Sequence, residues 1–222
     1  MIYCIGDSFT FGTELPDAIE NIKHSELAWP TLLSNKLNLP VTNLGRPACS
    51  NARMVNRSLD CVWKKDADLI IIAWSAAGRF ELLDNFGVFS VWAGMALTDQ
   101  SPKMHHEIVR NLTSIYTEKT DNWYLRKWYR QIILLQHFFK FYNQKYIMVQ
   151  THQSHDLTMK YWQNNIDLLE KIDSSYFLGW PNQAFVDWTW KLPKGKMGHF
   201  LEQGHEVVAD KLYEYIKSMQ LL

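Results

Sequence analysis

The chain has 222 residues, of which 47% are hydrophobic and 21% are charged, a balance typical of one soluble globular domain with a sizeable core. Lysine plus arginine and aspartate plus glutamate both number 23, and this neutral balance argues against a general nucleic-acid binder, which needs an excess of basic residues. Three cysteines without a CxxC pair argue against a disulfide framework or a zinc knuckle and are typical of a reducing compartment.

No targeting segment is predicted. The first residues, Met1–Ile5, are apolar but reach Gly6 at once and have no basic region before them, unlike a signal peptide. The longest apolar stretch, Leu69–Trp74, is far shorter than the roughly 20 residues that cross a bilayer. We therefore expect a cytoplasmic protein without a membrane span.

Short apolar runs alternate with helical patterns along the chain. The runs predict strands at residues 2–5, 41–44, 69–74 and 146–149, with a further edge strand at Ala184–Val186. The periodic patterns predict helices at residues 29–39, 51–65 and 157–172 and at the end of the chain, through Val208 to Met219. Such alternation is typical of a parallel sheet with helices on both faces. We therefore predict one α/β domain over residues 1–222, a three-layer α/β/α sandwich around a central parallel sheet of about five strands.

The middle of the chain departs from this alternation. Residues 85–143 are expected to form a helical, aromatic-rich insertion, with one helical pattern from Ile108 to Tyr116 and a second from Trp123 to Tyr142. The shape of a substrate pocket depends on this region, so the sequence does not identify one substrate.

Ligands of such sheets bind beyond the carboxyl ends of the strands, so the residues after each strand are the candidates for a site. Gly6-Asp7-Ser8 follows the first predicted strand. A serine here lies where a helix begins and backbone N–H groups are free, and these groups can stabilise the oxyanion formed when Ser8 attacks an acyl carbon. The alternative is a simple turn in which Asp7 or Ser8 caps the helix.

A histidine lies where a base for this serine is needed. A serine nucleophile requires a neighbouring base, most often histidine, to take its proton. His199 precedes the last predicted helix, in a loop that the fold returns to the carboxyl edge of the sheet. A surface-loop histidine without a catalytic role is the alternative.

These blocks, at residues 6–12 and 199–209, resemble those of the SGNH (GDSL) hydrolase family, and together they span nearly the whole chain. The sequence is most similar to the GDSL-like proteins of large bacteriophages, which it also resembles in Trp29-Pro30 and Trp74-Ser75. The resemblance implies a flavodoxin-like α/β/α fold and an esterase, lipase or deacetylase that needs no metal or organic cofactor.

The same resemblance assigns roles to individual residues. Ser8 corresponds to the nucleophile and His199 to the general base, whereas His205 is expected to pack at the start of the last helix. The family places an aspartate three residues before the catalytic histidine, but this chain has Lys196 there. We expect Asp187 to orient His199 instead, with a backbone carbonyl group, or a slow or inactive protein, as the alternatives.

The oxyanion hole also departs from the family pattern. The glycine block of the family corresponds to Asn43–Asn51, with Ala48 at the position of the second glycine. The asparagine that is usual after the third strand is absent. We expect the backbone N–H groups of Ser8 and Ala48 to bind the oxyanion, with Ser75 or Asn51 as a further donor.

Four further side chains are expected to line the substrate site: Asp7, Arg79, Trp188 and Trp190. Arg79 follows the third predicted strand and could hold an anionic group of a substrate, whereas the two tryptophans could pack against a sugar or an acyl chain. His152 and His155 form an HxxH pair, but with no carboxylate or cysteine pattern to complete it, a polar loop is favoured over a metal site.

The sequence thus predicts hydrolysis of an ester through an acyl-enzyme on Ser8, with a small-molecule or carbohydrate ester as substrate. Two alternatives stay open. One is a weak or inactive SGNH-fold protein that binds a carbohydrate or a partner. The other is a structural component of a phage particle, which would associate with virions. The oligomeric state stays open as well.

Overall fold

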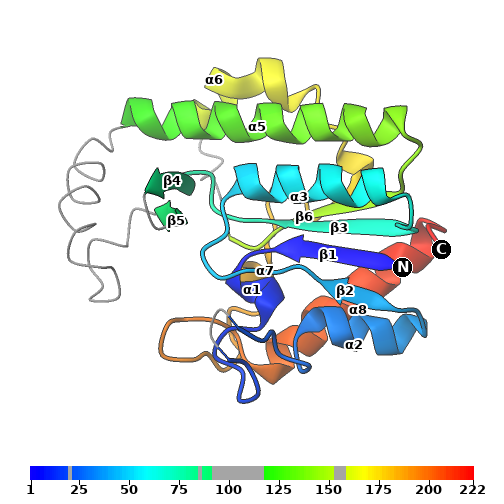
Figure 1. The fold of residues 1–222 in the computed structure, drawn as a ribbon. Coiled ribbons are helices and arrows are strands. Elements are labelled where there is room, and N and C mark those ends of the chain that lie inside the picture. The colour runs from blue at the N-terminus through cyan, green and yellow to red at the C-terminus, as the bar shows by residue number, and fades with distance from the viewer. Residues whose placement is uncertain (20–21, 85–86, 92–117, 153–158) are drawn as a thin grey trace.

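The structure, a computed structural model, describes the chain except for residues 20–21, 85–86, 92–117 and 153–158. A five-stranded parallel sheet lies at its centre (Figure 1). Its strands are β1 (Ile2–Gly6), β2 (Val41–Asn43), β3 (Leu69–Trp74), β6 (Tyr146–Gln150) and β7 (Phe177–Leu178). Their order in the sheet is β2-β1-β3-β6-β7, and every neighbouring pair is parallel. Counted along the chain this is 2-1-3-4-5, the order of flavodoxin-like doubly wound folds, so the predicted fold class is confirmed.

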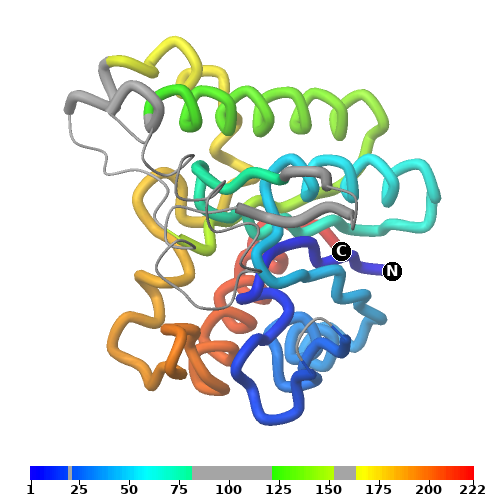
Figure 2. The backbone as a smooth tube through the Cα atoms, turned by 60° about the vertical axis from the view of Figure 1, so that its left-hand side comes forward, coloured from blue at the N-terminus to red at the C-terminus, as the bar shows by residue number. Residues whose placement is uncertain are grey.

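Helices cover both faces of this sheet (Figures 1 and 2). One face carries α3 (Asn51–Lys64), α5 (Glu118–Phe141) and α6 (Met159–Leu169). The other carries α2 (Trp29–Leu37) and α8 (Glu202–Ser218). Three short helical segments complete the described elements: α1 (Ser8–Phe11), the 3-10 turn η2 (Ser174–Tyr176) and α7 (Phe185–Trp188).

Alternate residues of the strands enter two separate hydrophobic cores. In β1, Tyr3 and Ile5 pack on the side of α3 and α5, whereas Ile2 and Cys4 pack on the side of α2 and α8. Because both faces are covered, β1, β3 and β6 are buried along their whole length. This double burial explains the uninterrupted apolar run Leu69–Trp74, which has no polar face to give to solvent.

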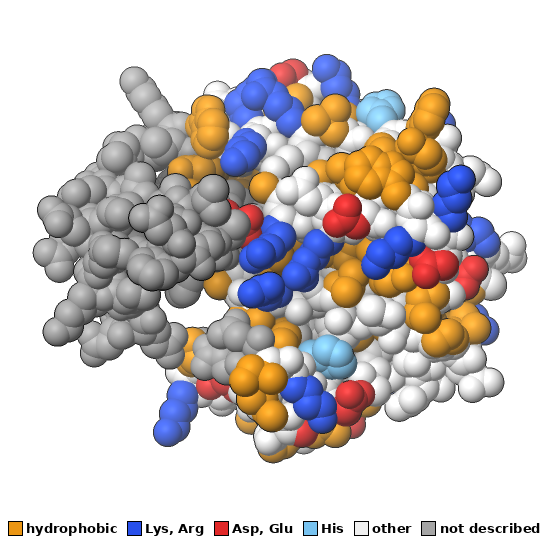
Figure 3. All heavy atoms as spheres, in the orientation of Figure 1, with side chains coloured by type: hydrophobic (Ala, Val, Ile, Leu, Met, Phe, Trp, Pro, Cys, Tyr) orange, Lys and Arg blue, Asp and Glu red, His pale blue; other side chains and the backbone are white. Residues whose placement is uncertain are grey.

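The two ends of the sheet differ in character. Both chain termini lie at the amino end of the strands (Figure 1). On the outer surface above α3 and α5, hydrophobic side chains gather towards this same end (Figure 3), among them the exposed Trp63, Phe141 and Tyr142. The carboxyl end, in contrast, is where β1 passes into α1 and where β3 and β6 end in polar residues.

Two sequence expectations need correction. Ala184–Val186 is not an edge strand, because the Asp187 carboxylate accepts the backbone N–H of Ala184 at 2.8 Å and stabilises the first turn of α7. The fifth strand is β7, which pairs with β6 at Met148 and Val149.

The expected insertion at residues 85–143 is also not helical at its start. The antiparallel strands β4 (Phe80–Asp84) and β5 (Gly87–Val91) form a small separate sheet there. The helical pattern at Ile108–Tyr116 lies outside the described residues. The pattern at Trp123–Tyr142 corresponds to α5, a single helix of 24 residues.

Candidate active site

The nucleophile candidate lies at the end of the central strand β1. Asp7 is the N-cap of α1, and its Oδ1 accepts the backbone N–H of Phe9 at 3.1 Å. Ser8 is therefore the first residue of the helix, where a backbone N–H has no acceptor within the helix. Capping by Asp7, considered from the sequence as the alternative to a catalytic serine, is thus the device that fixes Ser8 at the sheet edge.

Ser8 and His199 are 191 residues apart in the chain and in direct contact in the structure. The Ser8 Oγ lies 2.8 Å from Nε2 of His199, a hydrogen-bond distance. The imidazole is 12% exposed, and its ring lies 4.9 Å from the ring of Phe9. The predicted nucleophile and base are therefore brought together with the geometry that proton transfer requires.

The second nitrogen of His199 contacts a carboxylate that the sequence analysis did not anticipate. Its Nδ1 lies 2.9 Å from Oε2 of Glu14, in the segment after α1. Because a carboxylate only accepts hydrogen bonds, Nδ1 carries the proton and Nε2 is left free to accept the proton of Ser8. Glu14, rather than Asp187, thus occupies the third position of a Ser–His–acid arrangement, while Asp187 caps α7.

The position of Glu14 is fixed by unusual backbone on both sides of the contact. Glu14 has φ 71°, in the left-handed region that residues with a Cβ seldom adopt. Across the contact, a Cβ placed on Gly195 would lie 2.4 Å from the Glu14 carboxyl carbon, so only glycine leaves room for it. The carboxylate also accepts the backbone N–H of Met197 at 2.9 Å and that of His199 at 3.3 Å.

The same contacts keep Glu14 ionised. Burial raises its pKa, but the hydrogen bonds from the Met197 backbone and from His199 outweigh this effect and lower the pKa below its ordinary value of 4.5. A negative charge is therefore held against the imidazole at neutral pH.

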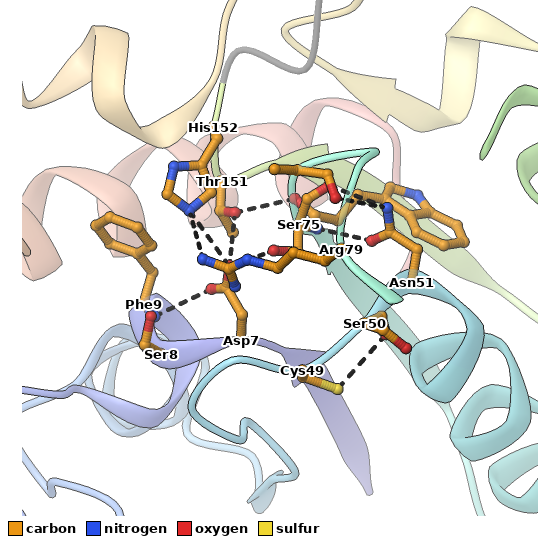
Figure 4. Close-up of polar contacts among 12 residues, drawn as sticks. Asp7, Ser8, Phe9, Cys49, Ser50, Asn51, Ser75, Arg79, Thr151 and His152 are labelled. Carbon is orange, nitrogen blue, oxygen red and sulfur yellow. Dashed lines mark hydrogen bonds and ion pairs between the residues drawn. The ribbon is translucent and has the colours of Figure 1, made fainter. Parts of the chain in front are cut away.

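Beside Ser8, Asp7 is the centre of a polar network from three strand ends (Figure 4). Its fully buried carboxylate accepts the hydroxyl groups of Ser75 (2.8 Å) and Thr151 (3.1 Å). Arg79 Nη1 lies 3.0 Å and His152 Nε2 3.5 Å from the same Oδ2. Burial raises the pKa of Asp7, but the hydrogen bond from His152 and the charge of Arg79 outweigh it and hold the pKa well below 3.8.

The loop after β2 brings Ala48 to this edge. The Asn43 amide donates to the Thr10 carbonyl at 2.8 Å, and Arg46 N–H donates to the Gly6 carbonyl at 3.0 Å, which ties the loop to β1 and α1. Ala48 itself has φ 57°, the left-handed conformation that favours glycine. Its backbone thus adopts the conformation expected where the family pattern has glycine.

The two side chains expected to supply a further oxyanion donor are engaged elsewhere. Ser75 donates its hydroxyl to Asp7 and its backbone N–H to Oδ1 of Asn51, at 2.9 Å. The Asn51 amide nitrogen donates to the carbonyl of Ser75 at 3.1 Å. Asn51, at the start of α3, therefore clamps the end of β3, and the expectation that Ser75 or Asn51 offers a free donor is not met.

The remaining candidates lie around this centre. Trp188 packs against Phe185 and donates its indole N–H to Gln183 at 3.1 Å, whereas Trp190 is 66% exposed. His205 is buried and accepts the backbone N–H of Trp29 at 3.1 Å, and burial lowers its pKa to about 3. It is thus a packing residue, as expected from the sequence.

Metal and membrane features were sought in the part of the chain that the structure describes. Within it, no three or more His, Cys, Asp or Glu side chains are grouped so as to hold a metal ion. His152 contacts Asp7 and Arg79, and His155 lies outside the described residues. None of the described helices has the length and apolar character needed to cross a bilayer.

Comparison with known proteins identifies the fold. No model of a known family and no curated protein matches this sequence. The solved structure of TesA superposes with a TM-score of 0.59 at 11% identity, over 100% of this chain and 99% of its own. The esterase EstA from Pseudoalteromonas sp. gives 0.58 at 12% identity, over 99% and 97%. A G-D-S-L family protein from Desulfitobacterium hafniense gives 0.55 at 15%, over 96% and 98%. The chain therefore has the α/β/α fold of GDSL lipolytic proteins and esterases along its whole length.

Proposed function

We propose that this protein hydrolyses an ester through an acyl-enzyme on Ser8. The observation that carries the proposal is the unbroken line of hydrogen bonds from Ser8 through His199 to Glu14, at 2.8 and 2.9 Å. A serine hydroxyl is a weak nucleophile at neutral pH, and a base within hydrogen-bond distance, itself oriented by a carboxylate, is what activates it.

In this mechanism the Ser8 Oγ attacks the carbonyl carbon of the ester while His199 Nε2 takes the hydroxyl proton. Glu14 stabilises the imidazolium that forms and keeps the ring in its productive tautomer. His199 then returns the proton to the leaving alcohol, which departs and leaves the acyl group on Ser8. A water molecule, deprotonated by the same nitrogen, attacks the acyl carbon and releases the acid.

The backbone N–H groups of Ser8 and Ala48 are proposed as the first two donors to the oxyanion. Ser8 N–H lies at the open N-terminus of α1, and the loop carrying Ala48 is tied to β1 and α1. The left-handed backbone of Ala48 supports this role, because strained residues concentrate at functional sites.

The proposed substrate is a small-molecule or carbohydrate ester. One structure with this fold is an acetyl xylan esterase, with a TM-score of 0.53 at 14% identity. In this chain Trp190 offers an exposed flat ring, beside Lys191, that suits a sugar face. Trp188 is proposed as a wall of the site rather than a contact, since it packs on Phe185.

The test compares wild type with Ser8→Ala and His199→Ala on a panel of chromogenic acyl esters. The proposal expects hydrolysis by wild type and a loss on the order of 10³-fold or more in kcat for each variant. Equal rates in all three proteins would reject the assignment and favour a binding protein that keeps the hydrolase fold.

A further inference from the structure

The oxyanion of the proposed reaction lacks its expected side-chain donor. Ser75 and Asn51 satisfy each other and Asp7, so neither can turn to a substrate without breaking a buried hydrogen bond. Removing one partner of such a bond costs about 1–3 kcal/mol. A different group in the same region must therefore take this role.

Arg79 lies in the segment after β3, the segment in which that donor was expected. Its Nη1 donates to Asp7 at 3.0 Å, and its Nη2 lies 3.5 Å from Nε2 of His152. Figure 4 shows the guanidinium between these two side chains, above the start of α1. A guanidinium has five N–H donors, and these two contacts leave the others available, while the side chain is still 13% exposed.

One carboxylate fixes Arg79 relative to the nucleophile. Asp7 Oδ1 holds the helix turn that begins with Ser8, and Asp7 Oδ2 holds the guanidinium. A cation set in place in this way needs no reorganisation when charge develops next to it, which is the property that makes such donors effective.

The buried charge of Asp7 gives an independent reason for a cation here. Asp7 is fully buried, ionised and adjacent in sequence to Ser8. Alone, this anion would oppose the negative charge that forms on the substrate oxygen, because Coulomb interactions are strong where water is excluded. Arg79 neutralises it within a 3.0 Å ion pair.

We propose that Arg79 supplies the third donor to the oxyanion, a charged N–H group in place of the missing amide. The proposal rests on the proposed ester hydrolysis. When Ser8 attacks, the former carbonyl oxygen becomes negative and accepts an N–H from Arg79 together with those of Ser8 and Ala48. No proton is transferred, because the guanidinium keeps its proton in proteins.

The experiment measures kcat and KM of Arg79→Ala and Arg79→Lys on a neutral acetyl ester and on an ester whose acyl chain carries a carboxylate. Arg126→Gln is the matched control, since it breaks an exposed ion pair with Asp167 on the outer helices. We expect Arg79→Ala to lose about 10²–10³-fold in kcat on both esters, with KM little changed. We expect Arg79→Lys to lose less, and added guanidinium to restore part of the Arg79→Ala rate.

Three results would overturn the proposal: an unchanged kcat on the neutral ester, a loss confined to the anionic ester, or a loss that guanidinium does not restore in a variant with the wild-type Tm. The second result would make Arg79 a specificity residue for anionic substrates. Ser8→Ala, measured alongside, separates the two hypotheses. If Ser8→Ala is as active as wild type, the proposed function fails, and if it is inactive while Arg79→Ala is fully active, only the role of Arg79 fails.

Discussion

Replacing Glu14 by glutamine tests the acid position most sharply, because the side chain keeps its size and loses its charge. The Glu14 carboxylate accepts three N–H groups: His199 Nδ1, the His199 backbone and the Met197 backbone. A glutamine has one oxygen and one NH₂ group in their place. If its oxygen serves Met197, the NH₂ group points at the His199 nitrogens, and two donors face each other.

That conflict is relieved when Nδ1 gives up its proton and accepts from the glutamine. The proton then resides on Nε2, which can no longer take the hydroxyl proton of Ser8. The same change of tautomer costs about 10⁴-fold in kcat in a well-characterised Ser-His-Asp enzyme. We expect about 10³–10⁴-fold here, which corresponds to about 4–5.5 kcal/mol at 1.36 kcal/mol per tenfold change.

The assay is steady-state hydrolysis of a chromogenic acyl ester, with the Tm of each protein measured in the same buffer. Asp187→Asn is the matched acid-to-amide control, because Asp187 caps α7, and its kcat should stay close to wild type. A Glu14→Gln enzyme as fast as wild type, or an Asp187→Asn enzyme as slow as Glu14→Gln is expected to be, would refute the reasoning.

Three further predictions follow from the geometry. Gly195→Ala should lower kcat with little change in Tm, because the new Cβ displaces the end of the flexible Glu14 side chain rather than backbone, and a Tm loss without a kcat loss would contradict this. Ala48→Gly should raise the free energy of unfolding by up to about 1 kcal/mol in denaturant titration, since its φ of 57° suits glycine; destabilisation would show that the loop is not strained. The pKa of His205 is lowered from 6.5 to about 3, so the folded state stays neutral where the unfolded chain binds a proton. Stability should therefore fall as the pH drops from 6.5 towards 3, by up to about 1.4 kcal/mol per pH unit. His205→Gln, which keeps an acceptor for Trp29 N–H, should flatten that slope, and an unchanged slope would assign it to other groups.

Much of the fold could be predicted because its strands are buried on both faces. Leu69–Trp74 is a continuous apolar run for this reason, and the sequence predicted its bounds as the structure has them. The last strand could not be found in the same way. Phe177–Leu178 has two residues, too few for any periodicity, and the apolar Ala184–Val186 nearby gave a false signal.

The candidate site shows the same division between pattern and geometry. Ser8 and His199 could be selected because each adjoins a regular element at the carboxyl edge of the sheet. Glu14 could not, because its contact with His199 depends on a left-handed backbone after α1 and on the space above Gly195. The only signal in the sequence was an acidic residue shortly after Gly12, which carries no period. Likewise, the engagement of Ser75 by Asp7 and Asn51 depends on side-chain contacts between separate strand ends.

The central claim is that Ser8 is an activated nucleophile, and a fluorophosphonate probe tests it directly, with peptide mass mapping to locate the adduct. The account predicts a single adduct on the peptide that contains Ser8. That adduct should be absent from heat-unfolded protein and strongly reduced in His199→Ala. Native protein that stays unlabelled at Ser8, while a serine esterase in the same tube is fully labelled, would contradict the account.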